Sequence, residues 1–275
     1  MEKVIIFLIG NYLNILNAIS PKMGGKQAFY IFCFPFKAKI NKKQQAYLDT
    51  ADQFKLPVDD FEIQCYRWGS GPRKILLVHG WQSNTYRWKK FIETLKMNEF
   101  SIYSFDAPGH GNSGSLFSNV PLYEKALSKI VDHIGNPESI ISHSIGSFST
   151  LYYMNENPQN VPLKMVSMAS PNSANDFVKE YSRILNLSEK TMTNLSAYFQ
   201  TYASKDISYF SLENLFEKNK TKGLIIHDKS DKVVTSDYAK KMHHLWPQSK
   251  LVITDGHGHK LNDDIIVRMV KEFVQ

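Results

Sequence analysis

The segment Ser142–Gly146 places a serine where it could act as a nucleophile. An apolar run, Ser139–Ile141, precedes it, and a helix-like stretch, Ser147–Tyr153, follows it. This order predicts a strand, a sharp turn with Ser144 at its tip, and a helix whose N-terminus points at the group under attack. Gly146 suits such a turn, because the strand and helix backbones nearly touch there. The motif is short, so its meaning depends on the segments that accompany it.

Two backbone N–H groups are candidates for an oxyanion hole. A serine that attacks a carbonyl carbon needs donors aimed at the oxygen that becomes negative in the transition state. Ile145 directly follows Ser144, and Trp81 lies in the loop after the apolar run Lys74–Val78. At this point the alternative remains open that His79–Trp81 is only a turn at the end of a strand.

Acidic and basic residues that could complete the site follow two later apolar runs. One predicted strand, residues 223–227, is followed by Asp228 and Asp231, and the last predicted strand by His257 and His259. A nucleophilic serine needs a base, and the base needs an orienting carboxylate. The order serine, aspartate, histidine, each at the end of a strand, is what an α/β sheet would supply. The residue types alone leave two carboxylates and two histidines open.

Taken together, these segments resemble the α/β-hydrolase superfamily of esterases and lipases from about Lys74 to Gln275. Five separated motifs carry the resemblance in the family's order and spacing: Leu76–Gly80, Phe105–Ser113, His143–Gly146, His227–Val233 and Gly256–His259. The departure is Ser142, which stands where the family usually has glycine. The sequence is thus similar to a family whose members use a serine nucleophile, an acidic residue and a histidine base in catalysis.

The resemblance implies an α/β-hydrolase fold, with a mostly parallel central sheet, helices on both faces and a helical cap insertion at about residues 172–216. It implies that Ser144 is the nucleophile and Asp231 the acid. His259 is the implied base, because it ends a Gly-x-Gly-His motif that a basic residue follows. Asp228 and His257 are the second choices, and Asp228 is expected to brace its loop.

The implied activity is that of a serine hydrolase that cleaves a carboxylic ester or thioester through an acyl-enzyme, without a cofactor. The predicted cap is rich in aromatic residues, so we expect a small-molecule substrate with an apolar acyl or aromatic group. Candidates for the substrate pocket are His143, Phe199 and Tyr202, although most cap rings are expected only to pack. The same triad would also support an acyltransferase or a cofactor-free haloperoxidase. A non-catalytic binding protein on this fold is the alternative from another class.

Two rival motifs favour other chemistry. His257 and His259 could form a metal pair, but no glutamate or cysteine lies near them, so no metal site is predicted. Gly109-x-Gly111-x-x-Gly114 matches the dinucleotide-binding fingerprint. A loop follows it where the fingerprint requires a helix, so no nucleotide cofactor is expected.

The composition agrees with one compact enzyme of 275 residues. Apolar runs alternate with helical patterns from Phe61 onward, which predicts a parallel sheet covered on both faces. We expect residues 59–275 to form the hydrolase domain and residues 1–58 an N-terminal helical segment packed on or flanking it.

Cys33 and Cys65 provide no disulfide framework, which favours a reducing compartment and a cytoplasmic location. Lysines are spread thinly, so nucleic acid is not an expected partner. The oligomeric state stays undetermined.

The N-terminal segment allows two interpretations. Val4–Ile19 is apolar apart from Asn11, Asn14 and Asn17, and it is short for a membrane span. The first fifty residues hold seven lysines and two acidic residues, in a chain of net charge +7. A helix packed on the hydrolase body is the expected reading. Peripheral contact of residues 1–43 with an anionic membrane is the alternative.

Overall fold

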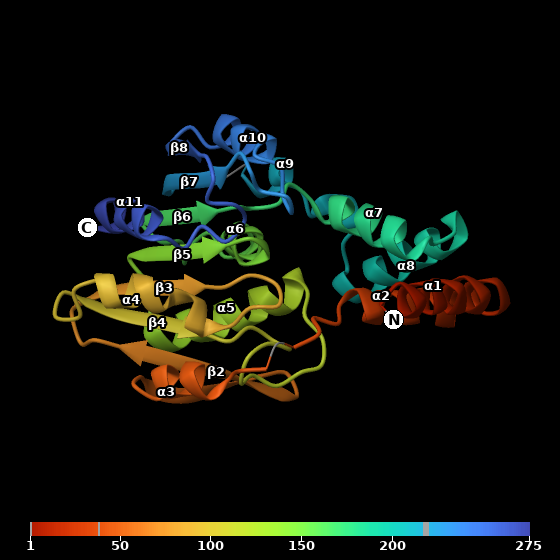
Figure 1. Cartoon of the computed structure of the whole chain (residues 1–275), viewed down its shortest axis with the longest axis horizontal. Coiled ribbons are helices and arrows are strands. Elements are labelled where there is room, and N and C mark those ends of the chain that lie inside the picture. Colours follow the sequence, from red (N-terminus) through yellow and green to blue (C-terminus); the bar gives the residue numbers. More distant parts are fainter. Residues whose placement is uncertain (1, 38, 217–219) are drawn as a thin grey trace. The chain divides into compact units, whose positions relative to one another are not determined.

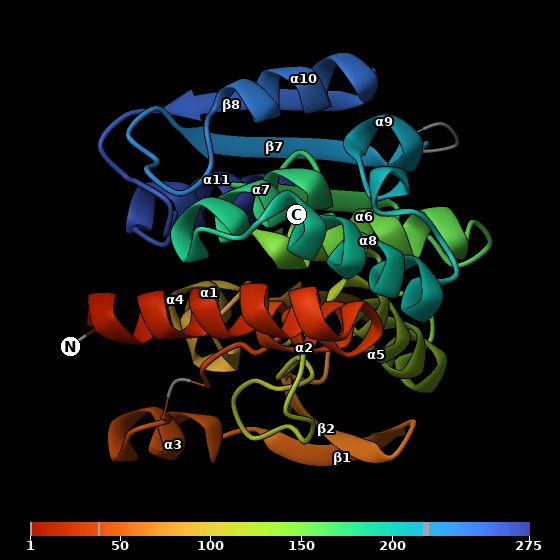
Figure 2. The same cartoon turned by 90° about the vertical axis from the view of Figure 1, so that its right-hand side faces the viewer.

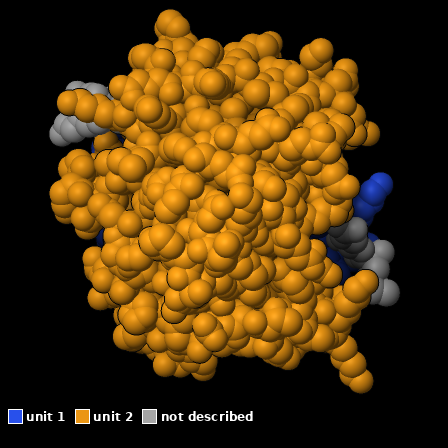
Figure 3. Space-filling model, turned by 90° about the vertical axis from the view of Figure 1, so that its left-hand side faces the viewer, with its two compact units in different colours: residues 1–34, 172–214 blue, residues 35–171, 215–275 orange. Residues whose placement is uncertain are grey.

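A computed structural model describes residues 2–37, 39–216 and 220–275. The chain divides into two compact units. Unit 1 comprises residues 1–34 and 172–214, and unit 2 comprises residues 35–171 and 215–275 (Figure 3). Each is described in turn.

Unit 2 is built on one eight-stranded sheet of order β1-β2-β4-β3-β5-β6-β7-β8 (Figure 1). β2 is antiparallel to both its neighbours, and all pairs from β4 to β8 are parallel. The prediction of a mostly parallel sheet is therefore confirmed. The strands are β1 (Asp52–Val58), β2 (Phe61–Trp68), β3 (Arg73–Val78), β4 (Phe100–Phe105), β5 (Ser139–His143), β6 (Lys164–Met168), β7 (Lys222–Asp228) and β8 (Ser249–Thr254).

Helices cover both faces of this sheet. Alternate residues of each central strand, such as Ile75 and Leu77 of β3, join one apolar cluster with side chains of α4 and α11. On the other face α5 packs against α6. The helices of unit 2 are α3 (Lys42–Leu48), η1 (Thr85–Trp88), α4 (Lys89–Thr94), α5 (Val120–Ile134), α6 (Ile145–Glu156), α10 (Asp237–Leu245) and α11 (Asp264–Val274); α9 (Leu212–Leu215) lies at the boundary of the units. Successive side chains of a strand point to opposite faces of the sheet. A strand that is apolar along its length therefore gives apolar side chains to both faces.

One boundary prediction needs correction. Residues 52–58 were expected to belong to the N-terminal helical segment, but they form the edge strand β1, paired with β2 across the turn at Asp59. As an edge strand, β1 is mostly exposed, so its sequence needs no continuous apolar run. Such runs were the signal that located the inner strands.

Unit 1 is helical and joins two distant stretches of sequence. It contains α1 (Glu2–Ile19), α2 (Pro21–Phe32), α7 (Ala174–Leu185), α8 (Glu189–Ala203) and η2 (Ile207–Tyr209). The insertion between β6 and β7 is thus helical, as expected of a cap. α2 packs on α8 (Figure 2), where a Cβ on Gly25 would come within 2.3 Å of the Asn194 carbonyl oxygen. Glycine permits this close approach of two helices. Among the described residues, no helix is long and apolar enough to cross a membrane.

Candidate active site

Ser144 sits at a strained turn between β5 and α6. Its backbone has φ 53° and ψ −130°, and its N–H donates to the Met168 carbonyl oxygen at 2.8 Å. A Cβ on Gly146 would lie 2.2 Å from the His79 carbonyl oxygen, so only glycine fits the close approach of α6 to the end of β3. Ser142 is fully buried and donates to the Val166 carbonyl oxygen at 2.9 Å, which accounts for a serine where glycine is usual.

The ends of three strands bring Ser144, His259 and Asp231 together. His259 Nε2 lies 3.2 Å from Ser144 Oγ, and His259 Nδ1 lies 2.8 Å from Asp231 Oδ2. With the proton on Nδ1, the histidine donates to the carboxylate and accepts from the serine hydroxyl. Ser144 is 7 % exposed and the Asp231 carboxylate is fully buried, while the His259 side chain between them is 20 % exposed.

The surroundings of Asp231 keep its carboxylate ionised. Burial acts to raise the pKa of Asp231, but hydrogen bonds outweigh it and hold the pKa far below its usual range. The donors are His259, the backbone N–H groups of Val233 and Val234 at 2.8 and 2.9 Å, and His227 Nε2 at 3.3 Å. The contact from His227 was not predicted, because the sequence marked that residue only as the end of a strand.

The second-choice residues make bonds elsewhere. Asp228 accepts from Ser230, from the Thr254 hydroxyl at 2.7 Å and from the His257 N–H at 3.0 Å. These bonds tie the loop after β7 to the loop after β8. The His257 ring pairs with Asp263, the N-cap residue of α11. Neither side chain bonds to Ser144 or His259 in the part of the chain that the structure describes.

The loop after β3 lies beside Ser144, where an oxyanion hole would be required. A Cβ on Gly80 would come within 2.9 Å of Ser144 Cβ. Within the described ranges, neither the Trp81 N–H nor the Ile145 N–H donates to a protein acceptor. Both N–H groups therefore remain free to donate to a ligand.

Two buried histidines hold this loop in place. The Ala107 N–H donates to His79 Nε2 at 2.9 Å, and the Gln82 N–H donates to His110 Nε2 at 3.1 Å. Burial lowers the pKa of His79 to about 4 and that of His110 to about 3, so both rings are neutral and can accept. His110 lies within the Gly109-x-Gly111-x-x-Gly114 motif, so this motif helps to position the loop that carries Trp81.

Comparison with known proteins identifies the family. The family model described as alpha/beta hydrolase fold matches residues 74–222, which is more than half of the chain. The chain belongs to the alpha/beta hydrolase family. No curated protein matches the sequence.

Solved structures similar to this hydrolase share its fold at low identity. A structure of ferulic acid bound to Est1E from Butyrivibrio proteoclasticus has a TM-score of 0.65 and 16 % identity, covering 80 % of this chain and 97 % of that one. A thioesterase domain from the curacin biosynthetic pathway has a TM-score of 0.62 and 13 % identity over 82 % and 99 %. A bacterial membrane phospholipase A has a TM-score of 0.63 and 14 % identity over 100 % and 98 %.

Two side chains hold the backbone of the hydrolase's histidine loop. His143 Nε2–H donates to the His259 carbonyl oxygen at 2.7 Å, and Arg87 Nη2 donates to the Lys260 carbonyl oxygen at 2.7 Å. His143 was expected in the substrate pocket, but its ring is buried, and burial and the nearby Arg87 cation hold its pKa well below the usual value. The sequence carried no signal for Arg87, because only the fold brings η1 next to Lys260.

The other two pocket candidates belong to unit 1. Phe199 is 4 % exposed, and its ring packs on Phe29 and Phe210 with centroids 5.9 and 5.1 Å apart. The ring of Tyr202 lies 4.9 Å from that of Phe29. Phe199 is therefore packed inside unit 1, whereas Tyr202 contacts Phe29 and stays 36 % exposed. Among the described residues, no group of three metal-ligating side chains occurs.

Proposed function

We propose that the protein is a serine hydrolase that cleaves a carboxylic ester or thioester through an acyl-enzyme on Ser144. The observation that carries the proposal is the hydrogen-bonded chain from Ser144 Oγ through His259 to the buried Asp231 carboxylate. This arrangement has the geometry that nucleophile, base and orienting acid require. The alpha/beta hydrolase fold and its esterase and thioesterase relatives support the same reading.

The reaction would begin with attack of Ser144 Oγ on the substrate carbonyl carbon. His259 Nε2 takes the hydroxyl proton, and the Asp231 carboxylate stabilises the imidazolium through Nδ1–H. The N–H groups of Trp81 and Ile145 stabilise the negative oxygen of the tetrahedral intermediate.

The imidazolium then returns its proton to the departing alcohol or thiol, which leaves Ser144 as an ester. A water molecule gives a proton to His259 and attacks the acyl carbon, so that the acid is released and Ser144 regains its hydroxyl. If another alcohol replaced this water, the same acyl-enzyme would carry out acyl transfer.

A panel of p-nitrophenyl esters and acyl thioesters of increasing chain length tests the proposal. We expect turnover that depends on chain length in the parent and falls to background in Ser144→Ala. Ser142→Ala is the matched control, since this buried hydroxyl lies two residues away and donates to the Val166 carbonyl oxygen. Equal turnover in Ser144→Ala and the parent would refute the proposed role of Ser144.

A further inference from the structure

Two asparagines of helix α1 face protein, while most of its exposed side chains are apolar. Asn14 donates to the Asn186 carbonyl oxygen at 3.0 Å and accepts from the Ser188 N–H and the Thr191 hydroxyl at 2.8 and 2.9 Å. Asn17 is fully buried and accepts from the Asn194 amide at 3.0 Å. Asn14 and Asn17 therefore attach α1 to the rest of unit 1, whereas Asn11 is exposed and donates to the Phe7 carbonyl oxygen of its own helix.

The opposite face of α1 is open and, apart from Asn11, apolar. At 100° per residue, Val4, Leu8, Ile15 and Ile19 point in one direction, away from the stripe of Gly10, Leu13 and Asn17 that packs inward. Leu8 and Ile15 are each 60 % exposed, and Ile19 is 78 % exposed. A helix on a water-facing surface normally shows the reverse arrangement. The exposed apolar side chains of α1 are Val4, Ile5, Phe7, Leu8, Tyr12, Ile15 and Ile19.

Exposed lysines lie on α1 and on the adjoining helix α2. Lys3 lies in the first turn of α1, and Lys22 and Lys26 lie on α2 close to its start; all three are exposed. The only acidic residue in the α1 and α2 sequences is Glu2. An apolar face together with cations on the same pair of helices matches the boundary between acyl chains and anionic headgroups.

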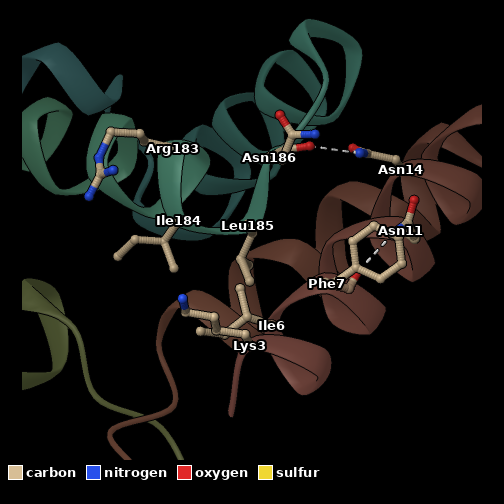
Figure 4. Close-up of a pocket in the computed structure, with 9 residues that line it drawn as sticks. All are labelled: Lys3, Ile6, Phe7, Asn11, Asn14, Arg183, Ile184, Leu185 and Asn186. Atoms are coloured by element: carbon tan, nitrogen blue, oxygen red, sulfur yellow. Dashed lines mark hydrogen bonds between the residues drawn. The ribbon is translucent and has the colours of Figure 1, made fainter. Parts of the chain in front are cut away.

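A groove adjoins the same face. It has a volume of about 550 Å³ and lies between α1 and the C-terminal end of α7, with Ile6, Phe7 and Ile184 among its apolar lining residues (Figure 4). Lys3 and Arg183 also line it, and Arg183 is paired with Glu180 at 2.6 Å. The apolar lining residues and Lys3 thus extend the exposed apolar face into the groove.

We propose that the exposed face of α1 and this groove form a docking surface for an anionic phospholipid bilayer. Because Asn14 and Asn17 stay hydrogen-bonded to unit 1, the helix lies along the membrane surface with one side on lipid and the other on protein. A second copy of the chain is a weaker match, since an isologous contact would bring the three lysines towards their own equivalents. The proposal is independent of the chemistry of Ser144.

The test is co-sedimentation of the full chain with phosphatidylcholine vesicles, with and without one quarter phosphatidylglycerol. We expect binding to the anionic vesicles at low salt and its loss as salt screens the lysines. Leu8→Asp with Ile15→Asp should lower the partition coefficient at least roughly tenfold for each side chain. Lys22→Gln with Lys26→Gln leaves the apolar face intact and should lower anionic binding about fivefold per lysine.

Leu163→Asp is the matched control, because Leu163 is 70 % exposed and belongs to unit 2. It should bind like the parent, and circular dichroism should show that every variant is folded. Failure of the parent to bind anionic vesicles, or equal binding by the α1 variant, would overturn the proposal. Sedimentation velocity that shows a parent dimer, made monomeric by the α1 substitutions without vesicle binding, would assign the face to a second copy and overturn it as well.

Discussion

Replacing Asp231 by asparagine should change the tautomer of His259 without unfolding the protein. Asp231 Oδ1 accepts from the N–H groups of Val233 and Val234, and Oδ2 faces His259 and His227. The amide oxygen of the new residue will occupy the Oδ1 position, where two donors require an acceptor. Its NH2 group will then face His259 Nδ1 and need an acceptor there.

This donor forces the proton of His259 from Nδ1 to Nε2. The Nε2–H then points at Ser144 Oγ, 3.2 Å away, and can no longer accept the hydroxyl proton. A wrong tautomer of this kind costs about four powers of ten in kcat, or about 5 kcal/mol of transition-state stabilisation. The assay is kcat and KM for a p-nitrophenyl ester, with thermal unfolding as the check on folding.

Asp228→Asn is the matched control for this prediction. Asp228 carries the same substitution three residues away, but its bonds go to Ser230, Thr254 and the His257 N–H. We expect it to lower stability by about 1–3 kcal/mol and activity by less than about thirtyfold. The reasoning is refuted if Asp228→Asn impairs kcat more than Asp231→Asn does.

Four further outcomes follow from the same structure. Gly146→Ala should destabilise the fold by about 3 kcal/mol or more in urea unfolding, because its Cβ would meet the His79 carbonyl; a normal midpoint would contradict the close approach. Arg87→Met should cut kcat about tenfold with little change in KM, as one charged hydrogen bond to the histidine loop is lost; unchanged kcat would exclude that role. The pKa of His79 is about 4 in the folded protein and about 6.5 in the unfolded chain. As the pH falls below about 6.5, the unfolded chain therefore binds a proton before the folded protein does. His79 alone should therefore lower stability by about 2 kcal/mol between pH 7 and pH 5. His110, whose pKa is also lowered, adds to this fall, and the fall should be less steep in His79→Gln. Phe199→Ala should cost about 3–5 kcal/mol of stability, whereas a shift in ester chain-length preference at unchanged stability would return this ring to the substrate pocket.

The sequence predicted the parts of this fold that repeat a strong local pattern. The inner strands are continuous apolar runs, and the turn at Ser144 is bounded by small residues, so both could be located in advance. The edge strand β1 could not, since its exposed side chains give no such run.

The contacts that support the candidate site were beyond the reach of sequence. Asp231 and His259 could be named because each follows a strand within a family motif. His143 and Arg87 donate to the carbonyl oxygens of His259 and Lys260 from distant parts of the sequence, and His227 contacts the Asp231 carboxylate from four residues away, at the end of β7. Which face of α1 is buried could not be predicted either. Asparagines at a spacing of three can be exposed to solvent, or they can form hydrogen bonds to α8 and its N-cap, as Asn14 and Asn17 do.

Covalent labelling with a fluorophosphonate, read by intact mass and peptide mapping, tests the central role of Ser144 most directly. We expect one adduct per chain on Ser144, unchanged labelling in Ser142→Ala, none in Ser144→Ala, and labelling slowed at least about a thousandfold in His259→Ala. An adduct that persists in Ser144→Ala, or a parent that stays unlabelled while it hydrolyses esters, would contradict the account.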